Sequence, residues 1–213
     1  MFEKAVILDM DGTILDSMPA WENVGGDYLR SHGVTPPDGF VNTVRAMSFE
    51  ESSRYMVDEF SLPVTYEELM QAIFDAVANK YRHQLLLKPD AGEFVRALHQ
   101  NGIPVCIATA TNIELAKAAM ERLNMTGYLE FILSCDEVGS GKERPDVFLE
   151  AARRMGVCPQ DTWVFEDSLM CIRTAKGAGF RTVGIWDAAS SGNWEEICRV
   201  ADRAVKSFDE LLV

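Results

Sequence analysis

Basic residues are scarce in this sequence. Its 213 residues include 20 lysines and arginines against 33 aspartates and glutamates, which gives a formal net charge of -13. A surface this acidic repels a phosphate backbone, so we expect no binding to nucleic acid. A small anionic substrate remains compatible with the composition, because a local site can reverse the sign of the overall charge.

The sequence also lacks the features of secreted and membrane proteins. No apolar run approaches the length that spans a bilayer, and the opening MFEKAVILD has no basic segment followed by an apolar stretch. The cysteines are odd in number, widely spaced and without a CxxC pattern, which favours buried, unpaired thiols in a reducing compartment. We therefore expect a cytoplasmic protein without membrane contact. The five cysteines are Cys106, Cys135, Cys158, Cys171 and Cys198.

Short apolar runs recur along the chain with the length of β-strands. None alternates cleanly between apolar and polar residues, which is typical of strands covered on both faces of a parallel sheet. From residue 103 onward, helix-like segments separate the runs, at 112–124, 145–155 and 169–178. This alternation predicts an α/β fold with a doubly wound, Rossmann-like parallel sheet. The five expected strands span 4–9, 103–109, 130–135, 162–167 and 181–186.

The segment 16–88 contains helix signals but no strong strand signal. Ser17 is a candidate N-cap for a first helix, and Ser48 and Thr65 each begin a capping-box pattern. We expect about four helices here, inserted directly after the first strand. The predicted organisation is a core of residues 1–15 and 89–213 with a helical domain at 16–88.

Acidic residues follow two of the expected strands. Asp9 and Asp11 come directly after the apolar run AVIL, and Glu166 and Asp167 end the run WVFED. Parallel sheets bind ligands beyond the carboxyl ends of their strands, so these side chains lie where a site is expected. Four acids there would repel one another without a cation, and such hard oxygen ligands suit Mg²⁺ together with a substrate phosphate. Taken alone, Glu166 and Asp167 could simply favour a turn.

Thr109 and Lys142 could supply complementary groups. A hydroxyl at the end of the strand 103–109 can bind a phosphate oxygen, although it could equally cap the next helix, for which Thr111 and Asn112 are better placed. Lys142, in GSGKERPD, could neutralise both a phosphate and a carboxylate, the alternative being a solvated loop lysine. A carboxylate, a cation, a hydroxyl and a lysine together suggest phosphoryl transfer through an aspartyl-phosphate.

Taken in order, these motifs resemble those of the haloacid dehalogenase (HAD) superfamily, in the branch of phosphohydrolases with a helical cap inserted after the first motif. The motifs are DMDGT at 9–13, Thr109 in IATAT, Lys142 in GKERPDVF and EDS at 166–168, so the resemblance covers nearly the whole chain. It implies a helical cap that closes over the site, excludes water and selects the substrate. The sequence is most similar to the subgroup of β-phosphoglucomutase and sugar-phosphate phosphatases.

The resemblance also implies a role for each motif residue. Asp9 would be the nucleophile, and Asp11 the general acid and base. Thr109, Ala110 and Lys142 would contact the substrate phosphate, with Thr109 and Lys142 also stabilising charge during catalysis. Mg²⁺ would be held by Asp9, Asp167 and the main-chain carbonyl of Asp11, with Glu166 in support.

Two departures from the mutase pattern favour a phosphatase. In the mutase an arginine of the cap holds a second phosphate, and the matching stretch here, AMSFEES, has Phe49 at that place. Asn112 stands where the mutase has a lysine after the second motif. Asp11 in turn argues for phosphate chemistry, because a dehalogenase does not need the second acid. We expect a monomer that hydrolyses a small phosphorylated metabolite, with a phosphomutase as the alternative.

A receiver-like signalling domain is the non-enzymatic alternative, because it also groups acids, a threonine and a lysine around a phosphorylatable aspartate. Such domains have no helical insertion after the first strand, so the segment 16–88 counts against this class. Four residues of the helical domain are candidates for substrate contact, with packing or solvation as an equal alternative for each. They are Trp21, Arg45, Phe49 and Arg54.

Overall fold

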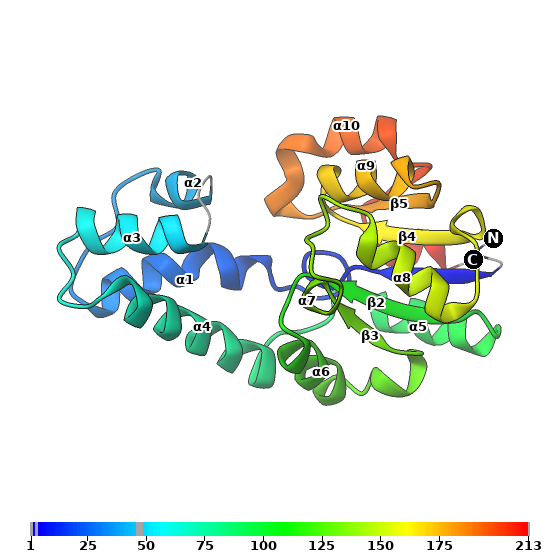
Figure 1. Cartoon of the computed structure of the whole chain (residues 1–213), viewed down its shortest axis with the longest axis horizontal. Helices are drawn as coiled ribbons and strands as arrows, with labels where there is room; N and C mark the ends of the chain where they lie inside the picture. The colour runs from blue at the N-terminus through cyan, green and yellow to red at the C-terminus, as the bar shows by residue number, and fades with distance from the viewer. Residues whose placement is uncertain (1, 3, 46–48, 213) are drawn as a thin grey trace. The chain divides into compact units, whose positions relative to one another are not determined.

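The chain folds into two compact units, which a computed structural model describes for residues 2, 4–45 and 49–212 (Figure 1). Residues 1–17 and 85–213 form one unit, called the sheet unit here, and residues 18–84 form the other, the helical unit. The side chains of residues 42, 45 and 49–51 lie outside the described part.

The sheet unit is built on six parallel strands. They are β1 (Ala5–Leu8), β2 (Val105–Thr109), β3 (Ile132–Ser134), β4 (Thr162–Glu166), β5 (Arg181–Ile185) and β6 (Arg203–Val205). Their order is β3-β2-β1-β4-β5-β6, and every neighbouring pair is parallel. The predicted α/β class with a doubly wound sheet is therefore confirmed.

Two details of the sheet differ from the sequence prediction. The strand expected at 130–135 is shorter, because Ser134 caps a helix that begins at Cys135. The strand β6 was not predicted at all. Its three residues, Arg-Ala-Val, are too few and too polar to form an apolar run, and the strand exists because it pairs with β5 at the edge of the sheet.

Six helices accompany the strands in the sheet unit. They are α5 (Ala91–Gln100), α6 (Ile113–Arg122), α7 (Cys135–Val138), α8 (Asp146–Met155), α9 (Leu169–Gly177) and α10 (Trp194–Val200). Asn112 caps α6 as expected, accepting a hydrogen bond from the N–H of Glu114 at 3.0 Å. Ser168 occupies the N-cap position of α9, without a capping hydrogen bond from its side chain.

Apolar side chains cover both faces of the sheet, which explains why the strands do not alternate with polar residues. On one face, Val164 of β4 belongs to a core cluster with Phe148 of α8 and Ala175 of α9. On the opposite face, the next residue, Phe165, packs against Phe94 of α5 with ring centroids 5.3 Å apart. Successive strand residues thus enter different cores.

The helical unit contains α1 (Met18–Ser31), α2 (Phe40–Arg45), α3 (Phe49–Glu59) and α4 (Tyr66–His83). The capping box expected at Thr65 is confirmed. The N–H of Glu68 donates to the Thr65 hydroxyl at 3.2 Å, and the N–H of Thr65 donates to the Glu68 carboxylate at 2.8 Å. The box expected at Ser48 lies outside the described residues.

The chain leaves the sheet unit after residue 17 and returns to it at residue 85, and the two segments beside these points pair antiparallel within the sheet unit. The N–H of Asp16 donates to the carbonyl of Leu86, and the N–H of Lys88 donates to the carbonyl of Ile14, both at 2.9 Å. This pairing brings residues 85–88 into the sheet unit, so the observed division falls after Ser17 and after Gln84.

The cysteines carry no disulfide. Cys106, Cys135 and Cys171 are buried as expected, whereas Cys158 and Cys198 are exposed, so the expectation of buried thiols is wrong for these two. Among the described residues, the structure has no helix that is both long and apolar enough to cross a membrane.

We predict that Thr65→Ala lowers the free energy of unfolding of the helical unit by about 1 kcal/mol, because it leaves a helix N–H of α4 without its partner. Denaturant unfolding followed by far-ultraviolet circular dichroism measures the change. Thr65→Ser keeps the accepting oxygen and is expected to stay close to the parent stability. Equal losses in both variants would contradict a capping role.

Candidate active site

Three carboxylates meet at the carboxyl edge of the sheet. Asp9 follows β1, Glu166 ends β4, and Asp167 comes directly after β4, a strand paired with β1. The N–H of Asp9 donates to the carbonyl of Phe165 at 3.0 Å, which fixes the two strand ends together. Oxygens of the three side chains lie within 4.8 Å of one another, and all three residues are buried. Asp9 of the first motif and both acids of the fourth motif therefore form one cluster.

Lys142 reaches the same cluster from the loop after α7. Its ammonium forms ion pairs with Asp9 and with Glu166, the latter at 2.7 Å, and the residue is only 6% exposed. Burial alone would lower the pKa of Lys142, but the two carboxylates outweigh burial and hold the pKa above its ordinary value. The alternative of a solvated loop lysine is excluded by this burial.

The carboxylates are not fully balanced by Lys142. Three negative charges against one positive charge leave a formal charge of minus two on buried groups. Burial and then the neighbouring Asp9 carboxylate raise the pKa of Asp167 to about 7, and the same two causes raise the pKa of Glu166. A divalent cation with a preference for hard oxygen ligands would restore balance, so the residues fit Mg²⁺.

Asp11 lies in a different environment from Asp9. Gly12 adopts a left-handed conformation, with φ of 80°, and turns the chain directly after Asp11. Ser17 donates a hydrogen bond to Oδ1 of Asp11 at 2.7 Å, and Thr111 donates to Oδ2 at 2.6 Å. The Asp11 side chain is not a member of the three-carboxylate cluster. Two acids one residue apart are thus held by different partners.

The hydroxyl groups of Ser17 and Thr111, which donate to Asp11, were not assigned to the site from the sequence. Ser17 precedes α1 and was interpreted as its cap, yet its hydroxyl donates to Asp11. Thr111 was considered only as a helix cap. The available signal was the cluster of hydroxyl residues in ATAT after β2, a strand that neighbours β1 and so ends beside the first motif.

Thr109 is fully buried at the end of β2, and Ala110 after it is exposed. The Thr109 oxygen accepts a hydrogen bond from the N–H of Thr111 at 3.0 Å, which leaves the hydroxyl hydrogen available to another acceptor. The contact of Thr109 and Ala110 with a substrate phosphate stays a prediction.

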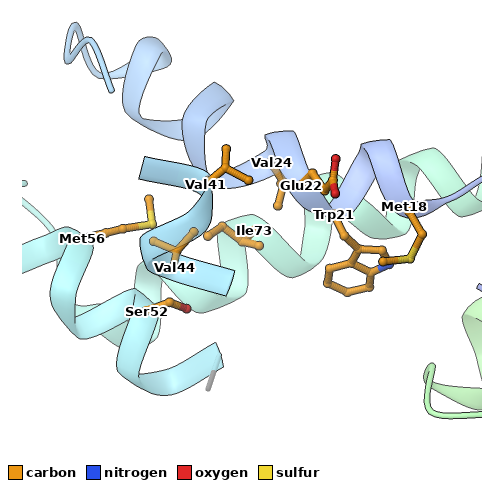
Figure 2. Close-up of a pocket in the computed structure, with 10 residues that line it drawn as sticks. Met18, Trp21, Glu22, Val24, Val41, Val44, Ser52, Met56 and Ile73 are labelled. Atoms are coloured by element: carbon orange, nitrogen blue, oxygen red, sulfur yellow. The ribbon is translucent and has the colours of Figure 1, made fainter. Parts of the chain in front are cut away.

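A pocket lies entirely within the helical unit. It has a volume of about 290 Å³ and is lined mainly by apolar side chains from all four helices (Figure 2). Trp21 lies in this lining and donates its indole N–H to the hydroxyl of Tyr81 at 2.9 Å. Arg54 instead stacks on the ring of Tyr66, 3.6 Å from its centroid. The side chains of Arg45 and Phe49 lie outside the described residues.

We predict that Asp167→Asn stabilises the protein when divalent cations are absent. The pKa of Asp167 is raised in the folded state, so folding is accompanied by uptake of a proton between about pH 4 and pH 7. Above that range the ionised carboxylate destabilises the folded state. The free energy of unfolding should rise on the order of 2 kcal/mol at pH 8, and the gain should shrink toward pH 4. Denaturant unfolding in the presence of a chelator measures it, and a gain independent of pH would contradict a charge effect.

Comparison with known proteins identifies the family. The family model for haloacid dehalogenase-like hydrolases matches residues 3–179. A Drosophila melanogaster protein named probable pseudouridine-5'-phosphatase is 32% identical over 187 residues, which cover 85% of this chain and 80% of that protein. Fructose-1-phosphate phosphatase YqaB of Escherichia coli is 29% identical over 194 residues, 87% of this chain and 98% of that protein.

A solved structure confirms the fold. The HAD family hydrolase of Deinococcus radiodurans, crystallised with bound phosphate and sodium, has a TM-score of 0.79 at 22% identity, and the match covers 98% of this chain and 93% of that one. The family match spans most of the chain and agrees with the ordered motifs and with the sheet that carries them. The chain belongs to the haloacid dehalogenase-like hydrolase family.

Proposed function

We propose that this chain is a Mg²⁺-dependent phosphatase that hydrolyses a small phosphorylated metabolite through an aspartyl-phosphate on Asp9. The observation that carries the proposal is the buried cluster of Asp9, Glu166 and Asp167. Lys142 forms ion pairs with two of these acids, Asp9 and Glu166, and separate hydroxyl donors bind Asp11. The named activities of the two relatives, on pseudouridine 5'-phosphate and fructose 1-phosphate, support phosphoric monoester hydrolysis.

The first chemical step is attack on phosphorus by the carboxylate of Asp9. The bond between Asp9 oxygen and phosphorus forms as the bond between phosphorus and the leaving oxygen breaks. Asp11 gives its proton to the leaving oxygen, so the alcohol departs neutral. In the second step Asp11 takes a proton from water and the water oxygen attacks phosphorus. The bond between phosphorus and the Asp9 oxygen breaks, which releases inorganic phosphate and regenerates the Asp9 carboxylate.

Lys142 holds the carboxylate of Asp9 in position for this attack. Its ammonium lies against Asp9 and Glu166 in a buried place where an electrostatic contact is strong. Thr109 would donate its hydroxyl hydrogen to a phosphate oxygen. Mg²⁺, held by Asp9, Asp167 and the main-chain carbonyl of Asp11 with Glu166 in support, would neutralise charge on the transferring phosphoryl group.

Ser17 and Thr111 hold Asp11 in one orientation by donating to its two carboxylate oxygens. A carboxylate bonded on both oxygens cannot rotate freely, and proton transfer to the leaving oxygen requires a fixed approach. These contacts support the division of roles, in which Asp9 attacks and Asp11 transfers protons.

The helical unit would select the leaving group, as the family resemblance implies. A panel of alkyl and aryl phosphates, sugar phosphates, phosphoglycolate and nucleoside monophosphates, assayed for phosphate release with Mg²⁺, would define the substrate class.

We predict that the protein hydrolyses an aryl phosphate such as p-nitrophenyl phosphate with Mg²⁺, and that Asp9→Asn lowers kcat by on the order of 10³-fold or more. The amide cannot attack phosphorus. Asp16→Asn is the matched control, because Asp16 is an exposed acid of the same segment, and it should leave kcat unchanged. Continuous absorbance measures nitrophenol release.

Three results would argue against this proposal. Full activity of Asp9→Asn would exclude Asp9 as the nucleophile. A long-lived phosphoprotein without turnover would favour a signalling domain. Isomerisation of a phosphosugar that depends on a bisphosphate activator, with little net phosphate release, would favour the phosphomutase alternative.

We predict that Thr111→Val lowers kcat about tenfold and changes KM less than twofold, because Asp11 loses one of the two donors that orient it. Thr126→Val is the control, since Thr126 is exposed. Steady-state kinetics over a range of substrate concentrations separates the two constants. A rise in KM at constant kcat would instead indicate a role of Thr111 in substrate binding.

A further inference from the structure

The turn after β5 contacts the carboxylate cluster. Ser190 donates its hydroxyl hydrogen to Oδ2 of Asp167 at 2.8 Å, and Asp167 is 6% exposed. Ser190 lies in the 3-10 helix Ala188–Asn193, which none of the four sequence motifs includes. One oxygen of a proposed cation ligand is therefore held by a side chain outside the motifs.

Asp187 fixes the turn that carries Ser190. Its Oδ1 accepts from the N–H of Ala189 at 2.8 Å, and its carbonyl accepts from the N–H of Ser190 at 3.2 Å. Its Oδ2 forms an ion pair with Lys88 at 2.7 Å, and both side chains are largely buried, at 7% and 12% exposed. Lys88 also donates to the carbonyl of Trp186 at 2.9 Å.

Lys88 in turn is hydrogen-bonded to the loop that carries the first motif. Its N–H donates to the carbonyl of Ile14, which follows the DMDGT motif directly. The ion pair thus joins the loop after β1 to the turn after β5, and the turn reaches Asp167 through Ser190. All of these residues belong to the sheet unit.

We propose that Ser190 is a positioning residue for Asp167 as a cation ligand, and that the ion pair of Lys88 with Asp187 holds Ser190 in the place where it can donate. This inference rests on the proposed Mg²⁺ site. Hydrogen bonds from a second layer of residues orient ligating carboxylates, and their loss typically weakens metal binding about 10- to 100-fold.

The first test compares Mg²⁺ binding of Ser190→Ala with that of the parent protein by isothermal titration calorimetry. We expect the Kd for Mg²⁺ to rise at least tenfold. Ser191→Ala, in the exposed neighbouring serine, should bind Mg²⁺ normally, and Ser190→Thr should restore most of the affinity. An unchanged Kd in a folded Ser190→Ala protein would overturn the proposal.

The second test removes the ion pair without changing the net charge, in the double variant Lys88→Met with Asp187→Asn. Asparagine can still accept from the N–H of Ala189, so the turn keeps its cap. We expect weaker Mg²⁺ binding, and no further weakening when the pair is removed from Ser190→Ala, because the pair acts through Ser190. Equal weakening in both backgrounds, or unchanged binding, would overturn the anchoring role. Lys206→Met is the control for an exposed lysine.

Mg²⁺ binding by the parent protein distinguishes failure of this inference from failure of the proposed function on which it rests. If the parent binds no Mg²⁺, the proposed metal site fails and this inference fails with it. If the parent binds Mg²⁺ and Ser190→Ala binds it equally well, only the positioning role is refuted. The Mg²⁺-dependent rise in Tm gives a second readout of binding that does not require a substrate.

Discussion

The repulsion among three buried carboxylates is the constraint on which the site depends. Oxygens of Asp9, Glu166 and Asp167 lie within 4.8 Å of one another, and one lysine cannot neutralise all three. Burying uncompensated charge is unfavourable, so the sheet must hold these groups together by its own stability. The strand ends can do so because β1 and β4 are paired in the centre of the sheet, with apolar cores on both faces. Folding energy from the cores thus offsets strain at the site, as is common at functional sites.

Separate environments give the two acids of the first motif different chemistry. The chain turns at Gly12, so that Asp9 pairs with Lys142 while the hydroxyl groups of Ser17 and Thr111 donate to Asp11. A carboxylate beside an ammonium is suited to nucleophilic attack, whereas one that accepts hydrogen bonds from hydroxyl groups can take part in proton transfer. The two acids of one motif can therefore take different roles in the proposed reaction.

The fold was predictable because its signals are local and repeated. Apolar runs with turn residues after them identified five of the six strands, and the capping box at Thr65 identified the start of α4. The strand β6 was missed since its three residues have no pattern of their own and depend on pairing with β5. The motif acids and Lys142 were found because their residue types and order are informative. Ser17, Thr111 and Ser190 were not, because serine and threonine are common in turns and nothing local distinguishes a donor to a carboxylate.

The amino-acid sequence by itself determined the α/β class, the helical insertion after the first strand, and the acids and lysine available for chemistry. These depend on periodicity and residue type, which the chain carries locally. Only the tertiary structure decided which acids share Lys142, which hydroxyls hold Asp11, and how Lys88 and Asp187 connect the first-motif loop to Asp167 through Ser190. Those contacts join residues separated by as many as 133 positions, and their geometry exists only once the strands are paired.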